Sequence, residues 1–295
     1  MFEGFRHVDI ACASARIHAR LGGAGPPLLL LHGHPQSHVM WHCVVDTLAR
    51  HFSVVAADLR GYGDSQRVAA SAGHANYSKR AMALDMVQLM AALGHARFAV
   101  CAHDRGARVT HRLLLDHPQT VTRAMLLDIA PTLEMYEHTS DDFARAYWHW
   151  FFLIQPAPLP ERLIDADPKA YLRDLMGRRH GGLSVFAPEA FAEYERCISL
   201  PGSATAMCED YRAAAGIDLE HDRADRAAER KVQTPLRVLW GAQGVVARCF
   251  EPLALWQQVA ANVSGRAIDS GHYIAEEAPQ ALLAEVDSFF KESTP

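Results

Sequence analysis

The sequence predicts an α/β fold with a mostly parallel sheet, and two observations support this class. Short apolar runs end on polar residues, as buried strands do, at residues 28–31, 53–57, 97–101 and 124–127. Apolar residues at helical spacing lie between them or follow them, at residues 82–93 and 105–116. Because strands that alternate with helices return by crossover connections, this order predicts parallel strands.

A change of pattern after Pro131 predicts a helical insertion. Residues 131–231 carry Trp, Tyr, Phe, Pro and charged residues without a clear strand. The alternation then resumes with a strand at 236–241, a helix at 252–261, a strand at 265–268 and a closing amphipathic helix at 275–290. We therefore expect an α/β core formed by residues 1–130 and 232–295 and a helical cap formed by residues 131–231. The Ala-rich piece Val68 to Ala75 is expected to be a loop.

The composition excludes several classes of protein. The 295-residue chain is 49% hydrophobic and 21% charged, which is too apolar for a mainly disordered protein. Its net charge is −5, and no run of Lys and Arg could follow a phosphate backbone, so no nucleic-acid partner is expected. No apolar run approaches the ~20 residues that cross a bilayer. Charged residues interrupt residues 1–16, unlike a secretory signal. We expect a cytoplasmic protein without a membrane partner.

Cysteine and histidine spacing gives no disulfide or metal pattern. The six cysteines contain no C-x-x-C pair and are expected to be free thiols. The 17 histidines include no H-E-x-x-H motif, which would indicate zinc. We therefore expect neither a metal nor a cofactor.

The segment Ala102–Gly106 contains the sharpest chemical motif. It matches the strand–turn–helix pattern small-x-nucleophile-x-Gly, with Asp104 at the nucleophile position. On this scaffold the acid and the histidine follow the nucleophile in the chain, and the sequence offers Asp128 and His272 in that order. The stretch after the strand at 236–241 carries no carboxylate, which favours Asp128 as the acid that orients His272.

Two backbone N–H groups are candidates for an oxyanion hole. His34 follows the strand at 28–31, and Arg105 follows the nucleophile, so both N–H groups are expected to face the same oxygen. Asp58, which opens a Gly-rich turn, is expected to be structural and to hold a loop near the mouth of the site.

Three segments carry a resemblance to a known family: His32–Trp41, His103–Arg108 and Tyr147–Phe152. Over nearly its whole length the chain resembles the α/β-hydrolase superfamily, and more narrowly the fluoroacetate (haloacetate) dehalogenases. The resemblance implies an eight-stranded, mostly parallel sheet flanked by helices, and it alone suggests a homodimer. It implies Asp104 as nucleophile, Asp128 and His272 as activators of water, Arg105 and Arg108 as ligands of the substrate carboxylate, and His149, Trp150 and Tyr211 as halide ligands.

Simple chemistry agrees with these implied roles. A carboxylate is already ionised at neutral pH, and the alkyl ester that it forms by displacement at a saturated carbon can be hydrolysed. Arg105 and Arg108 lie three apart at a helix start and share a face, where two guanidinium groups can bind one carboxylate. Fluoride is a poor leaving group that needs several hydrogen-bond donors. The expected reaction converts a haloacetate and water into glycolate and halide.

Other interpretations remain open at this point. Asp104 could be a helix cap, Asp128 a structural residue, the arginines surface residues, and the three halide candidates aromatic packing. An epoxide hydrolase would also use an Asp nucleophile and a His-Asp pair, with cap tyrosines such as Tyr211. A haloalkane dehalogenase would leave the two arginines without a role, and a non-catalytic receptor would not need the triad. Ala102, Ala107 and His34 depart from the residues common in the family, which affects the expected substrate range.

Overall fold

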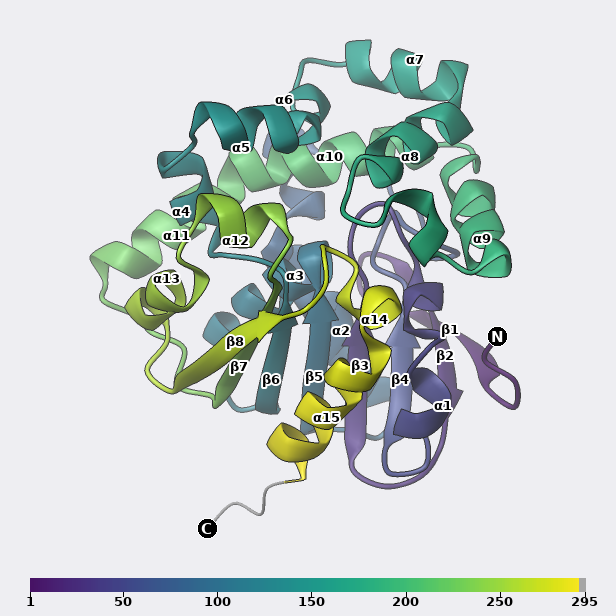
Figure 1. Cartoon of the computed structure of the whole chain (residues 1–295), viewed down its shortest axis with the longest axis vertical. Coiled ribbons are helices and arrows are strands. Elements are labelled where there is room, and N and C mark those ends of the chain that lie inside the picture. Colours follow the sequence, from purple (N-terminus) through teal and green to yellow (C-terminus); the bar gives the residue numbers. More distant parts are fainter. Residues whose placement is uncertain (292–295) are drawn as a thin grey trace.

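The fold is built on an eight-stranded sheet (Figure 1), as the resemblance implied. A computed structural model describes residues 1–291. The strand order is β1-β2-β4-β3-β5-β6-β7-β8; β1–β2 and β2–β4 are antiparallel and the other pairs are parallel. The strands are β1 (Arg6–Ala11), β2 (Arg16–Gly22), β3 (Pro27–Leu31), β4 (Ser53–Ala57), β5 (Phe98–His103), β6 (Val121–Leu127), β7 (Leu236–Gly241) and β8 (Val263–Ile268).

Helices cover both faces of the sheet. Figure 1 shows α2 (Lys79–Ala92) and α3 (Asp104–Asp116) behind it and α1 (Val45–Leu48) and α15 (Pro279–Phe290) in front. The remaining core helices are α12 (Val245–Cys249), α13 (Pro252–Val259) and α14 (Ile274–Glu277), with short 3-10 helices at His38–Trp41 and Ala72–Tyr77. Leu28 to Leu31 in β3 are 0% exposed because both faces of this central strand are covered.

A helical segment between β6 and β7 lies above the carboxyl ends of the parallel strands (Figure 1). We call this segment, residues 132–227, the helical insertion. It contains α4 (Thr132–Glu137), α5 (Asp141–Ala146), α6 (Trp148–Leu153), α7 (Leu159–Ala166), α8 (Pro168–Gly177), a 3-10 helix (Gly182–Val185), α9 (Pro188–Ile198), α10 (Ser203–Ala215) and α11 (Ile217–Ala227). Within the described residues, none of the helices has the length and apolar character required to span a membrane.

Three local expectations need correction. β1 and β2 were not anticipated, because polar residues interrupt them and uninterrupted apolar runs mark only strands buried on both faces. The closing helix is two helices, separated at Ala278, since Pro279 supplies no N–H and starts a new helix. The expected loop from Val68 to Ala75 overlaps a 3-10 helix, which is tied down by the Tyr77 hydroxyl donating to the Val68 carbonyl at 2.9 Å.

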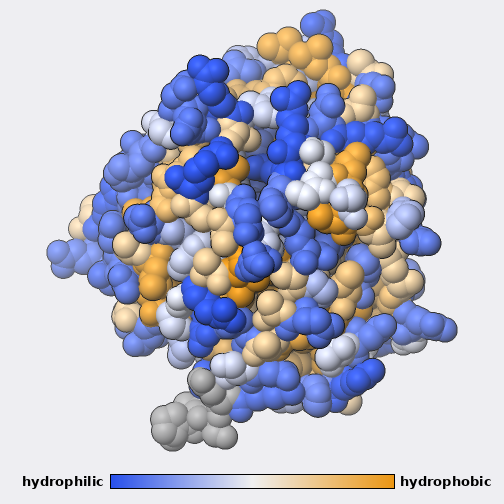
Figure 2. Space-filling model, in the orientation of Figure 1, coloured by the Kyte–Doolittle hydropathy of each residue, from blue (hydrophilic) through white to orange (hydrophobic). Residues whose placement is uncertain are grey.

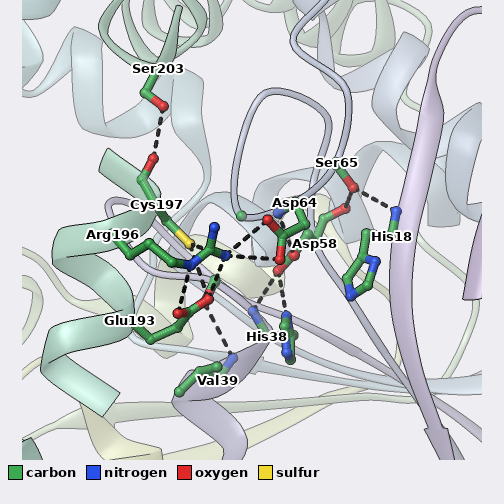
Figure 3. Close-up of polar contacts among 12 residues, drawn as sticks. His18, His38, Val39, Asp58, Asp64, Ser65, Glu193, Arg196, Cys197 and Ser203 are labelled. Atoms are coloured by element: carbon green, nitrogen blue, oxygen red, sulfur yellow. Dashed lines mark hydrogen bonds and ion pairs between the residues drawn. The ribbon is translucent and has the colours of Figure 1, made fainter. Parts of the chain in front are cut away.

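Asp58 anchors the loop after β4, as expected for a structural residue (Figure 3). Its Oδ1 accepts from the N–H of His38 at 2.7 Å and from Nδ1 of His38 at 2.9 Å, and its Oδ2 accepts from the N–H of Asp64 at 2.9 Å. Burial opposes ionisation, but the adjacent His38 outweighs it and holds the pKa of Asp58 well below its usual range. Nη2 of Arg196 in α9 donates a hydrogen bond to Oδ1 of Asp64 at 2.9 Å, so this loop connects the core to the helical insertion.

Candidate active site

Asp104 lies at a sharp turn between β5 and α3. It is the first residue of α3, and its φ of +43° lies in the left-handed region that few residues other than glycine adopt. A Cβ on Gly33 would lie 2.5 Å from Cβ of Asp104, and a Cβ on Gly106 would lie 2.5 Å from the carbonyl oxygen of His32. Small residues around Asp104 are therefore a steric requirement of the turn.

We expect Gly106→Ala to lower the free energy of unfolding by about 1–3 kcal/mol, the usual cost of overpacking. The added methyl meets backbone at His32, which cannot move aside as a flexible side chain would. Urea unfolding measures the effect. Gly177→Ala is the matched control, because that helical glycine has only ordinary contacts with Leu183 and should be neutral or gain up to ~1 kcal/mol. Equal stability of both variants would contradict the steric account.

The Asp104 carboxylate is held by a backbone donor and is strongly acidic. The His34 N–H donates to its Oδ1 at 2.9 Å, which is the contact expected of an oxyanion-hole donor. Burial opposes ionisation, yet the neighbouring His272 and Arg108 outweigh it and hold the pKa of Asp104 far below its usual range. The carboxylate is therefore ionised at neutral pH. The part assigned to the Arg105 N–H stays a prediction.

His272 is oriented from two sides. Its Nδ1 lies 2.5 Å from Oδ2 of Asp128, whose Oδ1 accepts from the N–H of Gly241 at 3.0 Å. His103 lies on the other side, with ring centroids 4.5 Å apart and Nε2 placed 2.8 Å from the His272 carbonyl oxygen. Burial lowers the pKa of His103 to about 3, so it is a neutral ring that donates to that carbonyl. The structure thus brings the predicted acid and histidine together.

Arg105 is fixed by an acid that the sequence analysis did not identify. Its Nε donates to Oδ2 of Asp210 at 2.8 Å, and its Nη2 donates to Oδ1 at 2.7 Å. Asp210 is also contacted by Lys79 and by the Tyr62 hydroxyl at 2.7 Å. The remaining nitrogen, Nη1 of Arg105, is buried and has no partner in the described residues. Asp210 therefore holds the guanidinium rigidly and leaves one donor face free.

Arg108 differs from Arg105, because no carboxylate of the described chain pairs with it. Its Nη1 donates to the Thr132 hydroxyl at 2.9 Å and to the Ala130 carbonyl at 3.2 Å. Its Nε is buried and without a partner among residues 1–291. Arg108 is 3% exposed, so the site contains a desolvated cation whose charge only the more distant Asp104 offsets. Such a cation favours an anionic ligand.

The helical insertion supplies three buried polar groups, and two of them belong to rings that lie against the two arginines. His149 Nδ1, Trp150 Nε1 and Tyr211 Oη are each buried and have no hydrogen-bond partner in the described part of the chain. The Arg105 guanidinium lies 4.1 Å from the Tyr211 ring centroid, and that of Arg108 lies 4.6 Å from the Trp150 ring centroid. The Tyr211 ring centroid lies 5.8 Å from that of His149 and 6.4 Å from that of Trp150. Buried donors without partners are costly, so this cluster of rings indicates a site for an acceptor or a small anion.

The same rings connect these donors to the nucleophile. The His34 ring centroid lies 5.1 Å from that of Tyr211 and 5.9 Å from that of His149, and the His34 N–H holds Asp104. Burial lowers the pKa of His34 to about 3, so this ring is neutral at the pH of most assays. All the predicted site residues therefore belong to one cluster.

Sequence reasoning missed the parts played by Asp210 and His103. His103 lies inside the motif around Asp104, and Asp210 lies next to Tyr211, but their contacts are made with residues far away in the chain, so no spacing indicated them. Tyr171, whose hydroxyl lies 3.4 Å from Nε2 of His34, gave no signal in the sequence at all.

Comparison with known proteins identifies close relatives over the full length. A family model described as alpha/beta hydrolase fold matches residues 26–279. The chain is 43% identical to a fluoroacetate dehalogenase of Burkholderia sp, covering 99% of this chain and 96% of the relative. It is 34% identical to a soluble epoxide hydrolase of Corynebacterium sp. (strain C12), covering 93% of each. A crystal structure of an α/β hydrolase, provisionally so described, from Nostoc sp PCC 7120 superposes with a TM-score of 0.97 at 51% identity, covering 99% of this chain and 100% of that one.

Proposed function

Because this chain belongs to the alpha/beta hydrolase fold family, we propose that this hydrolase acts on haloacetates and converts fluoroacetate or chloroacetate to glycolate and halide. The observation that carries the proposal is the pairing of two kinds of group in one buried site. The free donors of His149, Trp150 and Tyr211 suit a departing halide, and the rings of Tyr211 and Trp150 lie against two arginines that suit a carboxylate. The similarity to a fluoroacetate dehalogenase supports the same substrate class.

In the first step the free carboxylate oxygen of Asp104 attacks the carbon that carries the halogen. A carbon–oxygen bond forms, the carbon–halogen bond breaks, and the halide leaves with both bonding electrons. The N–H of His34 keeps the other oxygen in place and so orients the attacking one. The three donors stabilise the charge that develops on the halogen.

In the second step water hydrolyses the ester on Asp104. His272 accepts a proton from the water, and the resulting hydroxide attacks the carboxyl carbon of Asp104. Asp128, 2.5 Å from Nδ1 of His272, stabilises the imidazolium that forms. The N–H groups of His34 and Arg105 would stabilise the oxyanion. As the tetrahedral intermediate collapses, His272 returns its proton to the alkoxide oxygen of the departing glycolate, and the Asp104 carboxyl group releases a proton to solvent and becomes a carboxylate again.

The two arginines would share the substrate carboxylate unequally. Arg105 is neutralised by Asp210 and offers only Nη1, so it contributes mainly direction. Arg108 has no carboxylate within ion-pair distance among residues 1–291, so it contributes most of the attraction. Arg105 and Arg108 would therefore have different roles in binding the substrate, although their sequence positions suggest the same role.

We expect Arg108→Gln to lower kcat/KM for chloroacetate by about 10- to 100-fold, the worth of a charged hydrogen bond of ~1.5–3 kcal/mol. The loss should appear mainly in KM, because the interaction exists before bond cleavage. Arg108→Lys keeps the positive charge but lacks the planar guanidinium group, so its kcat/KM should lie between those of the wild type and Arg108→Gln. Steady-state halide release measures both. An unchanged KM in Arg108→Gln would refute this role.

Residues 131–231 are the proposed cap over a core of residues 1–130 and 232–295. The support is that α4–α11 all lie between β6 and β7 and that α6 and α10 supply the three donors. The cap would then close the site from water during the displacement step.

The direct test is halide release by the purified protein from fluoroacetate and chloroacetate, with styrene oxide assayed in parallel. We expect halide from both acids and no epoxide opening. Chloride alone would indicate a haloacid dehalogenase whose halide site is too weak for fluoride. Epoxide opening without halide release would instead favour an epoxide hydrolase, a reading supported by the free Tyr211 hydroxyl and the 34% identical relative.

A further inference from the structure

A cleft of about 160 Å³ runs between the helical insertion and the core and reaches His272. Its walls come from α5, α6, the end of α8 and the segment from β7 into α12. Figure 2 shows hydrophilic residues gathered at the centre of this face of the molecule, where the insertion meets the core. His180 closes one side, because a Cβ on Gly271 would lie 2.6 Å from the Cβ of His180. The cleft therefore connects the surface with the catalytic histidine.

The charges that line this cleft are all of one sign. Four arginines line it and no Asp or Glu does, although the whole chain carries a net charge of −5. One of them, Arg145, is paired with Asp141 at 2.7 Å. The other three have no carboxylate within ion-pair distance among the described residues, and we call them the arginine rim: Arg178, Arg179 and Arg248.

Arg179 is the rim member that reaches furthest toward the site. Its guanidinium lies 4.3 Å from the ring centroid of Tyr147. That ring is 6.4 Å from the ring of His272 and 5.2 Å from the ring of His149. A single aromatic ring thus separates Arg179 from both the catalytic base and the proposed halide donors, whereas Arg178 and Arg248 are exposed at the surface.

We propose that the arginine rim captures carboxylate substrates at the mouth of the cleft and delivers them to Arg108, favouring haloacids over neutral haloalkanes and epoxides. This inference rests on the proposed function. Positive charges in a cleft with low-dielectric walls focus the field and raise the local concentration of anions, with effects on association of about 10- to 1,000-fold. The rim touches none of the reacting atoms, so its residues determine capture and specificity and leave bond cleavage unchanged.

The kinetic test replaces the rim by glutamine in one triple variant, Arg178→Gln/Arg179→Gln/Arg248→Gln, and by lysine in a matched triple variant. At low ionic strength we expect the glutamine variant to lose about tenfold in kcat/KM for chloroacetate, with kcat retained. The lysine variant should recover most of the loss. At ~1 M salt, where the screening length is about 3 Å, the three proteins should converge. An equal kcat/KM in wild type and glutamine variant at low salt would overturn the proposal.

A second test does not depend on turnover and uses Trp148, which lines the same cleft. Trp41, Trp150 and Trp256 are fully buried, so in a Trp240→Phe background Trp148 is the half-buried tryptophan that remains. Quenching of its fluorescence by iodide should weaken in the glutamine variant, while quenching by neutral acrylamide should not change. Unchanged iodide quenching would refute capture of anions by the rim.

The two tests separate this inference from the proposed function. If the wild-type protein releases no halide from any haloacetate, the proposed function fails, and iodide quenching still decides whether the rim attracts anions. If halide is released but neither assay responds to the glutamine variant, the proposed function stands and the rim has no such role.

Discussion

Asp104→Asn should reduce halide release from chloroacetate by at least ~10³-fold, the scale seen when a nucleophile is removed. A neutral amide cannot displace halide from a saturated carbon, whereas the wild-type carboxylate is kept ionised by His272 and Arg108. The side chains are nearly equal in size, and asparagine also tolerates the φ of +43° at this position, so the fold should persist. Ion-selective electrode or chloride assays measure the loss.

The control for this variant is Asp46→Asn, at an exposed position in α1. It makes the same Asp-to-Asn change at an exposed position outside the proposed site and should retain full activity. Asp104→Ala, which cannot revert by deamidation, distinguishes true residual turnover from slow recovery of aspartate. Full activity in Asp104→Asn from the first measurement would exclude Asp104 as the nucleophile.

His272→Asn should stop the reaction halfway and trap the ester on Asp104. Displacement by the carboxylate needs no base, so one equivalent of halide should appear rapidly. Hydrolysis needs the proton acceptor that Asp128 orients, so turnover should then cease with a loss of at least ~10³-fold. Intact-protein mass spectrometry should show the added mass of one carboxymethyl group, and peptide mapping should place it on Asp104.

His180→Asn is the matched control for the trapped intermediate, since His180 is an exposed histidine that packs on the loop before His272. It should turn over without accumulating an adduct. If His272→Asn released no halide and carried no adduct, His272 would be required for displacement itself, and the assignment of two separate steps would be wrong.

The central strands and Asp104 are features that could be predicted from residues close together in the sequence. β3 to β7 were predicted because each has an apolar run bounded by polar residues, a pattern that burial on both faces imposes on any sequence. Asp104 was singled out because the sharp turn requires small neighbours within two residues, and the close approach at Gly106 agrees with that requirement. β1 and β2 were not predicted, because polar and charged residues interrupt their apolar positions and leave no uninterrupted apolar run.

The arginine pair shows what local information cannot provide. Arg105 and Arg108 share a face of α3, and from the sequence they are equivalent. The fold places Asp210 of α10, 105 residues away, against Arg105 and leaves Arg108 with neutral partners. Likewise, Arg179 and Arg248 belong to segments that meet only because the insertion folds over the core.

The sequence by itself determined the α/β class, the central strands, the position of the insertion and the candidate triad, because each depends on residues adjacent in the chain or on a repeating pattern of burial. Only the tertiary structure decided which arginine has an ion-pair partner, which donors stay free and which charges line the approach to His272. Those properties depend on electrostatic and hydrogen-bond partners supplied by distant segments, and a buried charge is defined by what packs against it.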